Sequence, residues 1–341
     1  MQLNDRKRQV LTAIVEDYVL TATPVGSRTI CGKYFASLSS ATIRNEMNTL
    51  THLGYLEQPH ISAGRVPNHR AYRLYVDGIQ SGGTLTRAEE QRIRQHLLER
   101  VQRLDDVVAG TAEALSELTR YAVVALMPKQ QDLRIMSLHL VPVSRNTALL
   151  VVVTDGGIIR DAFVHIAEVL DQDALYAISR MLSDQLHRKT MGQAQQLLRA
   201  LSHNAALDSQ VLEGIAEMAQ QLEKQAGSDS LRVSGAHYIL GYPEYRDVDK
   251  AVQVMAALED KGSLLELLKE DADGELTVRI GPENGIPALS DLSIVSSSYL
   301  VGRGHRGAIA LAGPTRMPYG RVLGTLNVAA RTISDMLASR Q

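Results

Sequence analysis

The sequence predicts an α+β protein of several domains, in which a mostly helical head precedes a larger body of strands and helices. Its 341 residues exceed one typical domain, and a 45% hydrophobic share supplies enough apolar material for several cores. Apolar side chains recur at helical spacing in the first eighty residues, whereas strand-like runs begin only after residue 133. After residue 165 the sequence is mostly helical, with one expected strand at 232–238, and further strands follow after 275, which indicates one α/β domain carrying an insertion.

The head begins with two predicted helices. Asn4 can cap a first helix whose apolar stripe includes Val10 and Ile14. After Pro24, a short second helix is expected to begin near Ser27.

The stretch 38–66 predicts a third helix followed at once by a small β-ribbon. Apolar positions recur at helical spacing from Ile43, and Gly54 ends the helix. A strand is expected at 55–58, and a turn at 62–65 should place one guanidinium at its tip. Three helices followed by a ribbon are the element order of a winged helix-turn-helix.

The third helix has a second face that the core does not use. It carries Arg44, Asn45 and Asn48, which are hydrogen-bonding side chains without acid. In a major groove, arginine pairs with guanine and asparagine with adenine, so this face predicts base recognition. The alternative is an ordinary solvated helix face that binds nothing.

Charge is distributed unevenly along the chain. Residues 1–78 contain nine Lys+Arg and six Asp+Glu, a net charge of +3, whereas the remainder contains 27 and 32, a net charge of -5. A basic head on an acidic body is typical of a protein that meets phosphates with one end only.

Composition also bounds the cellular setting. The single cysteine, Cys31, excludes a disulfide framework and a cysteine-based zinc site within one chain. The polar start of the chain does not resemble a signal peptide, and no apolar run approaches membrane-spanning length. We expect a cytoplasmic protein without membrane association.

The body is expected to open with helices. A joint at 80–83 precedes a capping box formed by Thr86 and Glu89, and an apolar seam then runs to Leu118. This seam predicts either a coiled coil between two copies or two helical pieces packed on the next domain.

Strands follow in two groups separated by helical sequence. Three strands are expected at 134–143, 147–154 and 158–165, with a hairpin at Asp155-Gly156-Gly157. A largely helical stretch covers 171–225. The later expected elements are strands at 232–238, 276–280, 293–301 and 307–312, and helices at 247–259, 263–271 and 319–339.

The body contains no pattern that demands catalysis. Gly302-x-Gly304-x-x-Gly307 leads into a strand rather than a helix, so we interpret it as a hairpin turn and not a dinucleotide site. The ten histidines are scattered singly, and we expect no metal, no cofactor and no enzymatic activity. Two Gly- and Pro-rich stretches, 280–285 and 313–320, are interpreted as loop geometry, with an effector site as the alternative.

Six segments of the chain carry a resemblance to a known family: PVGSRTI, LSSATIRNEMNTLTHLGYLEQPHISAGRVP, YRLYVD, IGPENG, LSDLSIVSSSYLVG and GPTRMPYGRV. In this order they resemble the heat-inducible transcription repressor (HrcA) family of bacteria. The resemblance spans nearly the whole chain, and its most specific segments lie toward the two ends.

The resemblance implies a homodimeric repressor that binds a long inverted repeat, the CIRCE operator, ahead of chaperone operons. It also implies that a GroEL-type chaperonin keeps the repressor active. The implied architecture is a winged helix at 1–80, a GAF-like domain at 84–190 and 260–341, and a mostly helical dimerisation domain inserted at 190–260. The alternative is a regulator whose GAF-like domain responds to a metabolite.

We hypothesise three kinds of DNA contact. The third helix would read bases, its N-terminus and the second helix would hold the phosphate backbone, and the ribbon loop would reach the neighbouring groove. The residues are Arg44, Asn45 and Asn48 for bases; Ser39, Ser40, Thr42, Arg28, Thr29 and Lys33 for the backbone; and His60, Ser62 and Arg65 for the loop.

Overall fold

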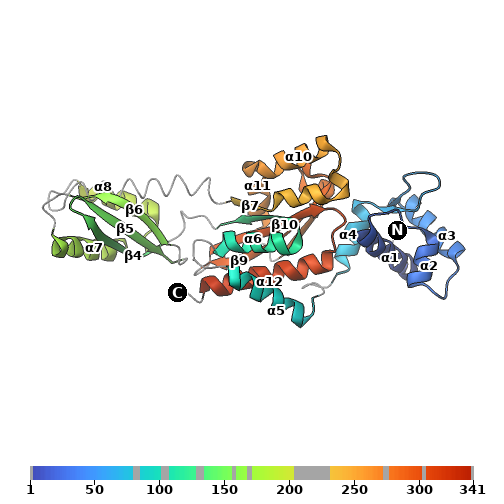
Figure 1. Cartoon of the computed structure of the whole chain (residues 1–341), viewed down its shortest axis with the longest axis horizontal. Helices are drawn as coiled ribbons and strands as arrows, with labels where there is room; N and C mark the ends of the chain where they lie inside the picture. The colour runs from blue at the N-terminus through green and yellow to red at the C-terminus, as the bar shows by residue number, and fades with distance from the viewer. Residues whose placement is uncertain are drawn as a thin grey trace.

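The computed structural model describes residues 3–79, 85–100, 107–127, 134–155, 159–166, 171–202, 231–271, 276–301 and 305–338. Figure 1 shows a helical N-terminal unit (residues 3–79), a central five-stranded sheet with helices, and a three-stranded sheet with two helices at the other end. Among the described helices, none combines the length and apolar character needed to cross a membrane.

The N-terminal unit has the expected order of three helices and a ribbon, and a fourth helix follows. Asn4 caps the first helix as predicted, since its side chain accepts a hydrogen bond from the Lys7 backbone N–H at 3.0 Å. Ile43, Met47 and Leu50 are buried, which confirms the predicted core face of the third helix. The elements are α1 (Asp5–Thr21), α2 (Ser27–Tyr34), α3 (Ser40–His52), β1 (Leu56–Glu57), β2 (Val66–Pro67) and α4 (His69–Asp77).

The ribbon is anchored to the start of α2 by an extra β-bridge. Val25 and Arg65 exchange two backbone hydrogen bonds, at 2.9 and 2.8 Å. A side chain at Gly64 would place its Cβ 2.4 Å from the Val25 carbonyl oxygen, so only glycine allows this close approach. The return arm of the ribbon is therefore held against the helices.

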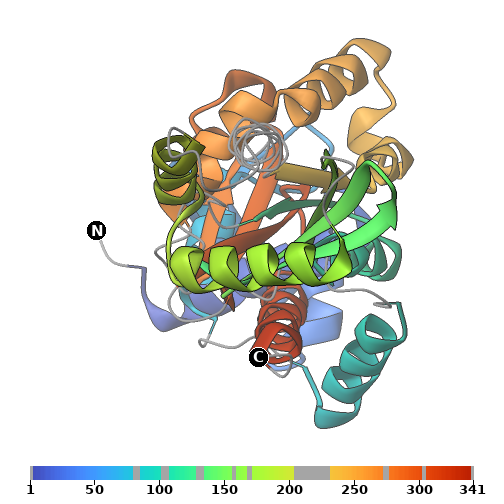
Figure 2. The ribbon, with the colours of Figure 1, turned by 90° about the vertical axis from the view of Figure 1, so that its left-hand side faces the viewer.

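The central sheet is antiparallel throughout, in the order β7-β3-β10-β9-β8. Helices cover both faces, with α5, α6 and α12 on one and α10 and α11 on the other (Figures 1 and 2). The strands are β3 (Ala122–Leu126), β7 (Leu231–Ser234), β8 (Leu276–Ile280), β9 (Leu292–Val301) and β10 (His305–Pro314). The helices are α5 (Arg87–Arg100), α6 (Val107–Thr119), α10 (Val248–Glu259), α11 (Lys261–Asp271) and α12 (Tyr319–Ala338).

One central strand, β3, was not expected from the sequence. All five of its residues are buried, because β7 and β10 flank it and helices cover both faces. A strand buried on both faces has no period-two pattern, so AVVAL resembles the end of a helical seam. The seam itself forms two helical pieces, α5 and α6, which pack on α12.

The second sheet stands apart from the first. It has the order β4-β5-β6 and a separate hydrophobic core with α7 and α8. Antiparallel pairing of Val153 with Ile159 confirms the hairpin predicted around Asp155, whose turn residues lie outside the described part of the chain. The elements are β4 (Ile135–Ser144), β5 (Thr147–Thr154), β6 (Ile159–His165), α7 (Gln172–Leu186) and α8 (Met191–Ser202).

This arrangement corrects the expected position of the insertion. The chain leaves the central sheet after β3 and returns with β7, so the inserted module lies within residues 127–230 and not at 190–260. The strands expected at 134–165 in the main domain belong to the insertion, and 231–260 pack on the central sheet. The wrong position follows from missing β3 in the sequence. When β3 is not recognised, the three strands of the insertion are taken for the first strands of the main sheet.

Candidate nucleic-acid interface

The solvent face of α3 carries the side chains expected to read bases. Arg44 and Asn45 are exposed, and neither side chain has a hydrogen bond or ion pair with another residue in the described part of the chain. The single acidic residue of α3, Glu46, is directed to α1, where its carboxylate lies 3.3 Å from Lys7 Nζ and 3.8 Å from Arg6. The exposed face is therefore free of unpaired negative charge.

The hydroxyls expected to meet phosphate gather at the start of α3. Ser39 caps the helix by accepting the Thr42 N–H at 3.0 Å, and the two hydroxyl oxygens lie 2.9 Å apart. Ser40 is half-buried, with its Oγ 3.2 Å from the Ser27 Oγ. Ser40 thus joins the starts of α2 and α3, while Ser39 and Thr42 form the helix N-terminus.

Arg65 and Asn48 contact each other rather than standing free. The Arg65 Nη2 donates to the Asn48 Oδ1 at 2.7 Å, and its Nε donates to the Thr51 Oγ1 at 2.9 Å. The expectation that Arg65 lies at the tip of the loop is therefore wrong, because this half-buried guanidinium ties the ribbon to α3. Asn48 retains its Nδ2 hydrogens, since only its carbonyl oxygen holds Arg65.

The tip of the ribbon loop instead contains His60, Ile61 and Ser62. All three are exposed, and Ile61 is fully so. Gln58 shapes the loop from within: its Nε2 donates to the carbonyl oxygens of Ile61 at 2.9 Å and Ala63 at 3.1 Å.

The polar side chains of α2 differ in their surroundings. Arg28 and Thr29 are exposed. The ammonium of Lys33 donates to the buried carboxylate of Asp17 at 2.6 Å, and this hydrogen bond raises the pKa of Lys33. The Lys33 ammonium is exposed, but its positive charge is paired with a carboxylate of the protein.

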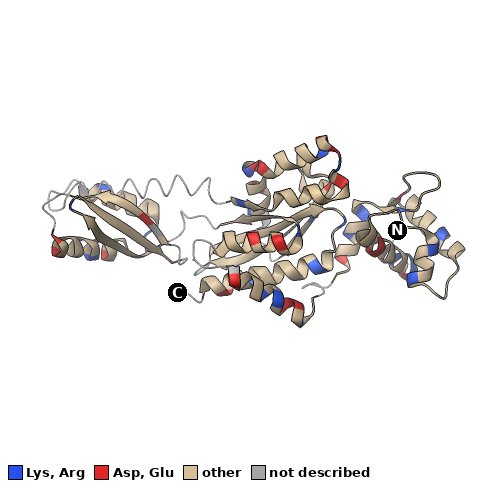
Figure 3. Ribbon diagram, in the orientation of Figure 1, with Lys and Arg blue, Asp and Glu red and all other residues tan. Residues whose placement is uncertain are grey.

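The basic residues of the candidate interface lie on α2 and α3. In Figure 3 the basic residues of α2 and α3 occupy the end of the N-terminal unit that is far from the central sheet. Exposed guanidinium groups, a helix N-terminus and amide side chains together suit contact with a phosphate backbone and base edges.

Comparison with known proteins identifies the family. The family model described as HrcA protein C terminal domain matches residues 105–323. The heat-inducible transcription repressor HrcA of Ruminiclostridium cellulolyticum is 36% identical over 339 residues, which cover 98% of this chain and 97% of that protein. The HrcA of Brevibacillus brevis is 37% identical over 341 residues, 99% of each chain. The chain belongs to the HrcA family.

HrcA relatives are named for heat-inducible repression of transcription, a regulatory function and not an enzymatic one. Heat-shock transcriptional repression is accordingly the function class of this chain. A solved crystal structure of a hypothetical protein at 2.2 Å resolution shares the fold, with a TM-score of 0.70, 24% identity and 100% coverage of both chains.

Two residues that shape this surface, Thr51 and Gln58, have no such role predicted from the sequence. Thr51 holds Arg65, and Gln58 orders the loop tip. Neither has a distinctive spacing in the sequence. Thr51 acts across the gap between helix and ribbon, and Gln58 bonds to backbone carbonyls of its own loop. A glutamine beside a Gly- and Pro-containing turn is the only signal that pointed to Gln58.

Proposed function

We propose that the N-terminal unit is a winged helix-turn-helix that binds the inverted-repeat CIRCE operator of chaperone genes. In this proposal α3 is the recognition helix and the loop 58–65 is the wing. The exposed, acid-free face of α3 carries the proposal, because its arginine and amide side chains suit base edges and the fold presents them outward.

The contacts that we propose follow the geometry of each side chain. Arg44 and Asn45 read bases, and Asn48 donates from its Nδ2 while its Oδ1 holds Arg65. Ser39, Thr42, Arg28 and Thr29 lie along the backbone, with Ser40 and Lys33 in supporting positions. His60 and Ser62 reach the neighbouring groove, and Arg65 acts by holding the wing in place.

An inverted repeat requires two heads related by a two-fold axis, so we propose a homodimer. The uncovered sheet face of the inserted module supports a homodimer, because it carries exposed apolar side chains. Val141, Leu149 and Phe163 are paired side by side across β4, β5 and β6, and Phe163 is 70% exposed. An apolar row of this kind is typical of a face that another chain covers.

The remaining assignments concern the body and its partner. We propose that the central sheet with its helices is GAF-like and that the insertion within 127–230 is the dimerisation domain. We also propose that a GroEL-type chaperonin maintains the active fold, and that client overload on heating releases repression.

The test compares Arg44→Ala with Arg92→Ala in binding to the chaperone-operon inverted repeat. Arg92 is an exposed arginine of α5, so both variants lose one positive charge. We expect Arg44→Ala to weaken binding by about 1–3 kcal/mol per half-site and to relax the base preference, as expected for a lost bidentate contact. Arg92→Ala should bind like the wild type.

Equal affinity of Arg44→Ala and the wild type would mean that the assignment of the exposed face of α3 as the reading face is wrong. Failure of the wild-type protein to bind the inverted repeat at low salt would reject the proposed function altogether.

A further inference from the structure

The N-terminal unit is packed on the central domain through α4. The rings of Tyr72 on α4 and Tyr319 at the start of α12 lie 6.1 Å apart between centroids, and both residues are buried. Buried apolar residues of the two parts form one continuous hydrophobic core, which includes Val76 and Met317. The head therefore shares its core with the body rather than standing apart from it.

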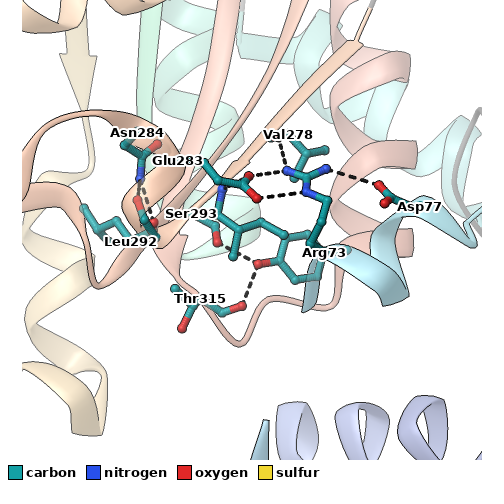
Figure 4. A network of polar contacts seen from close by, with 11 residues as sticks. Arg73, Asp77, Val278, Glu283, Asn284, Leu292, Ser293 and Thr315 are labelled. Atoms are coloured by element: carbon teal, nitrogen blue, oxygen red, sulfur yellow. Dashed lines mark hydrogen bonds and ion pairs between the residues drawn. The ribbon is translucent and has the colours of Figure 1, made fainter. Parts of the chain in front are cut away.

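Arg73 of α4 adds hydrogen bonds between the head and the body to this apolar contact. Arg73 binds the carboxylate of Glu283 with two nitrogens, one of them Nε at 3.0 Å, and donates to the Val278 carbonyl oxygen (Figure 4). Glu283 also accepts the Ile280 N–H at 2.9 Å. A two-point Arg–carboxylate pair fixes direction as well as distance, because its two parallel hydrogen bonds prevent rotation.

A second arginine makes the reverse connection, from the body into the head. Arg316 donates to the Val19 carbonyl oxygen in the last turn of α1 at 3.3 Å. The same guanidinium binds the Glu244 carboxylate with two nitrogens and lies 5.7 Å from the centre of the Tyr242 ring. Since α1 has no basic residue in its last turn, Arg316 supplies the positive charge that favours a helix C-terminus.

The acceptor loops are themselves held in place. The buried Asn284 donates to the carbonyl oxygens of Gly281 and Leu292, both at 2.8 Å (Figure 4). The Tyr319 hydroxyl donates to the Thr315 carbonyl oxygen at 2.6 Å and lies 2.6 Å from the Ser293 Oγ. The stretches 280–285 and 313–320, interpreted from the sequence as loop geometry, thus form a rigid seat for the head.

We propose that the clasp, defined as Arg73 with Glu283 and Arg316 with Val19 and Glu244, positions the reading head and so sets the half-site spacing that the repressor accepts. The inference rests on the proposed binding of an inverted repeat by a dimer. Moving one half-site by one base pair rotates it by about 35° around the duplex and shifts it by about 3.4 Å. A head fixed on a rigid body cannot follow that rotation, whereas a freely hinged head can.

The experiment measures binding of the full-length protein to operators whose half-sites are moved apart by one to five base pairs, and to a single half-site. The variants are Arg73→Ala and Glu283→Gln. The matched control is Arg94→Ala, which removes the 3.0 Å pair of Arg94 with Asp335 inside the body. Thermal unfolding of each variant verifies its fold, and Glu283→Gln retains an acceptor for Ile280 if Arg73→Ala does not fold.

We expect the wild type and Arg94→Ala to lose at least about tenfold in affinity at the half-turn displacement, because the second head can no longer engage. The shared core and Arg316 still hold the head in the clasp variants, so their spacing penalty should fall without vanishing, to less than about fivefold between the same two duplexes, with half-site affinity unchanged. A spacing ratio in both clasp variants equal to that of the wild type would overturn the inference, and so would a wild type indifferent to spacing. A wild type that binds neither duplex nor half-site would instead mean that the proposed function is wrong.

Discussion

Two cations on α2, Arg28 and Lys33, look equivalent in the sequence but have different surroundings. Lys33 is bound to the buried carboxylate of Asp17, and Arg28 is exposed with no side-chain partner in the described part of the chain. Phosphate binding releases counterions only to the extent that a free positive charge replaces them. Arg28 can supply such a charge, whereas that of Lys33 is already compensated.

We therefore predict that Arg28→Ala lowers the salt dependence of operator binding and that Lys33→Ala scarcely changes it. The slope of log K against log salt should fall by about 1 per subunit for Arg28→Ala. Lys33→Ala should lower the unfolding temperature, since it leaves a buried carboxylate unpaired. Equal reductions of the slope in both variants would show that Lys33 leaves Asp17 when DNA binds.

At the scale of elements, α4 and the loop after β8 meet through one titratable pair. Burial raises the pKa of Glu283, but the hydrogen bonds from Arg73 and the Ile280 N–H outweigh it and lower the pKa below the ordinary 4.5. The stabilisation from this carboxylate is thus complete above pH 4.5 and is lost as the pH falls through the lower, folded-state value.

Because the pKa of Glu283 is lowered, we predict that the unfolding temperatures of the wild type and Glu283→Gln differ in a pH-dependent way. The wild type should unfold at the higher temperature at pH 7, and the difference should shrink toward zero as the pH falls well below 4.5. A difference that persists unchanged at acid pH would show that the ionised carboxylate is not what stabilises the joint.

At the scale of the whole molecule, the insertion presents an apolar row on the sheet face opposite its helices. Leu138, Leu150 and Val164 face the core with α7 and α8, while Val141 and Phe163 point the other way and are exposed. An uncovered apolar row across a three-stranded sheet is a natural self-association surface, because a two-fold axis can place the same row against itself.

We predict that Phe163→Ser weakens dimerisation, with Tyr176→Ser as the matched control. The two aromatic side chains are 70% and 69% exposed, but Tyr176 lies on α7. Losing two buried phenyl groups across a two-fold interface should raise the dimer dissociation constant at least about tenfold. Sedimentation equilibrium measures this constant, and an unchanged value for Phe163→Ser would place the dimer surface elsewhere.

Local patterns sufficed for much of the fold. The cap at Asn4, the core face of α3, the hairpin at Asp155 and the long helix α12 all follow from spacing or turn chemistry within a short window. The exposed positions of Arg44 and Asn45 follow in the same way, since helical periodicity alone assigns them to the solvent side of α3.

Other features required the tertiary structure because their causes join residues far apart in the chain. The strand β3 has no period of its own, and only its neighbours β7 and β10 make it a strand. Arg65 is a structural tie and not a loop tip because Asn48 and Thr51 meet it across the ribbon. The pairing of Arg73 with Glu283 spans 210 positions, and no local pattern encodes such a contact. The sequence by itself thus determined the exposed polar face of α3 and the family resemblance, while folding decided which charges are free and how the head is held, since those depend on partners in space.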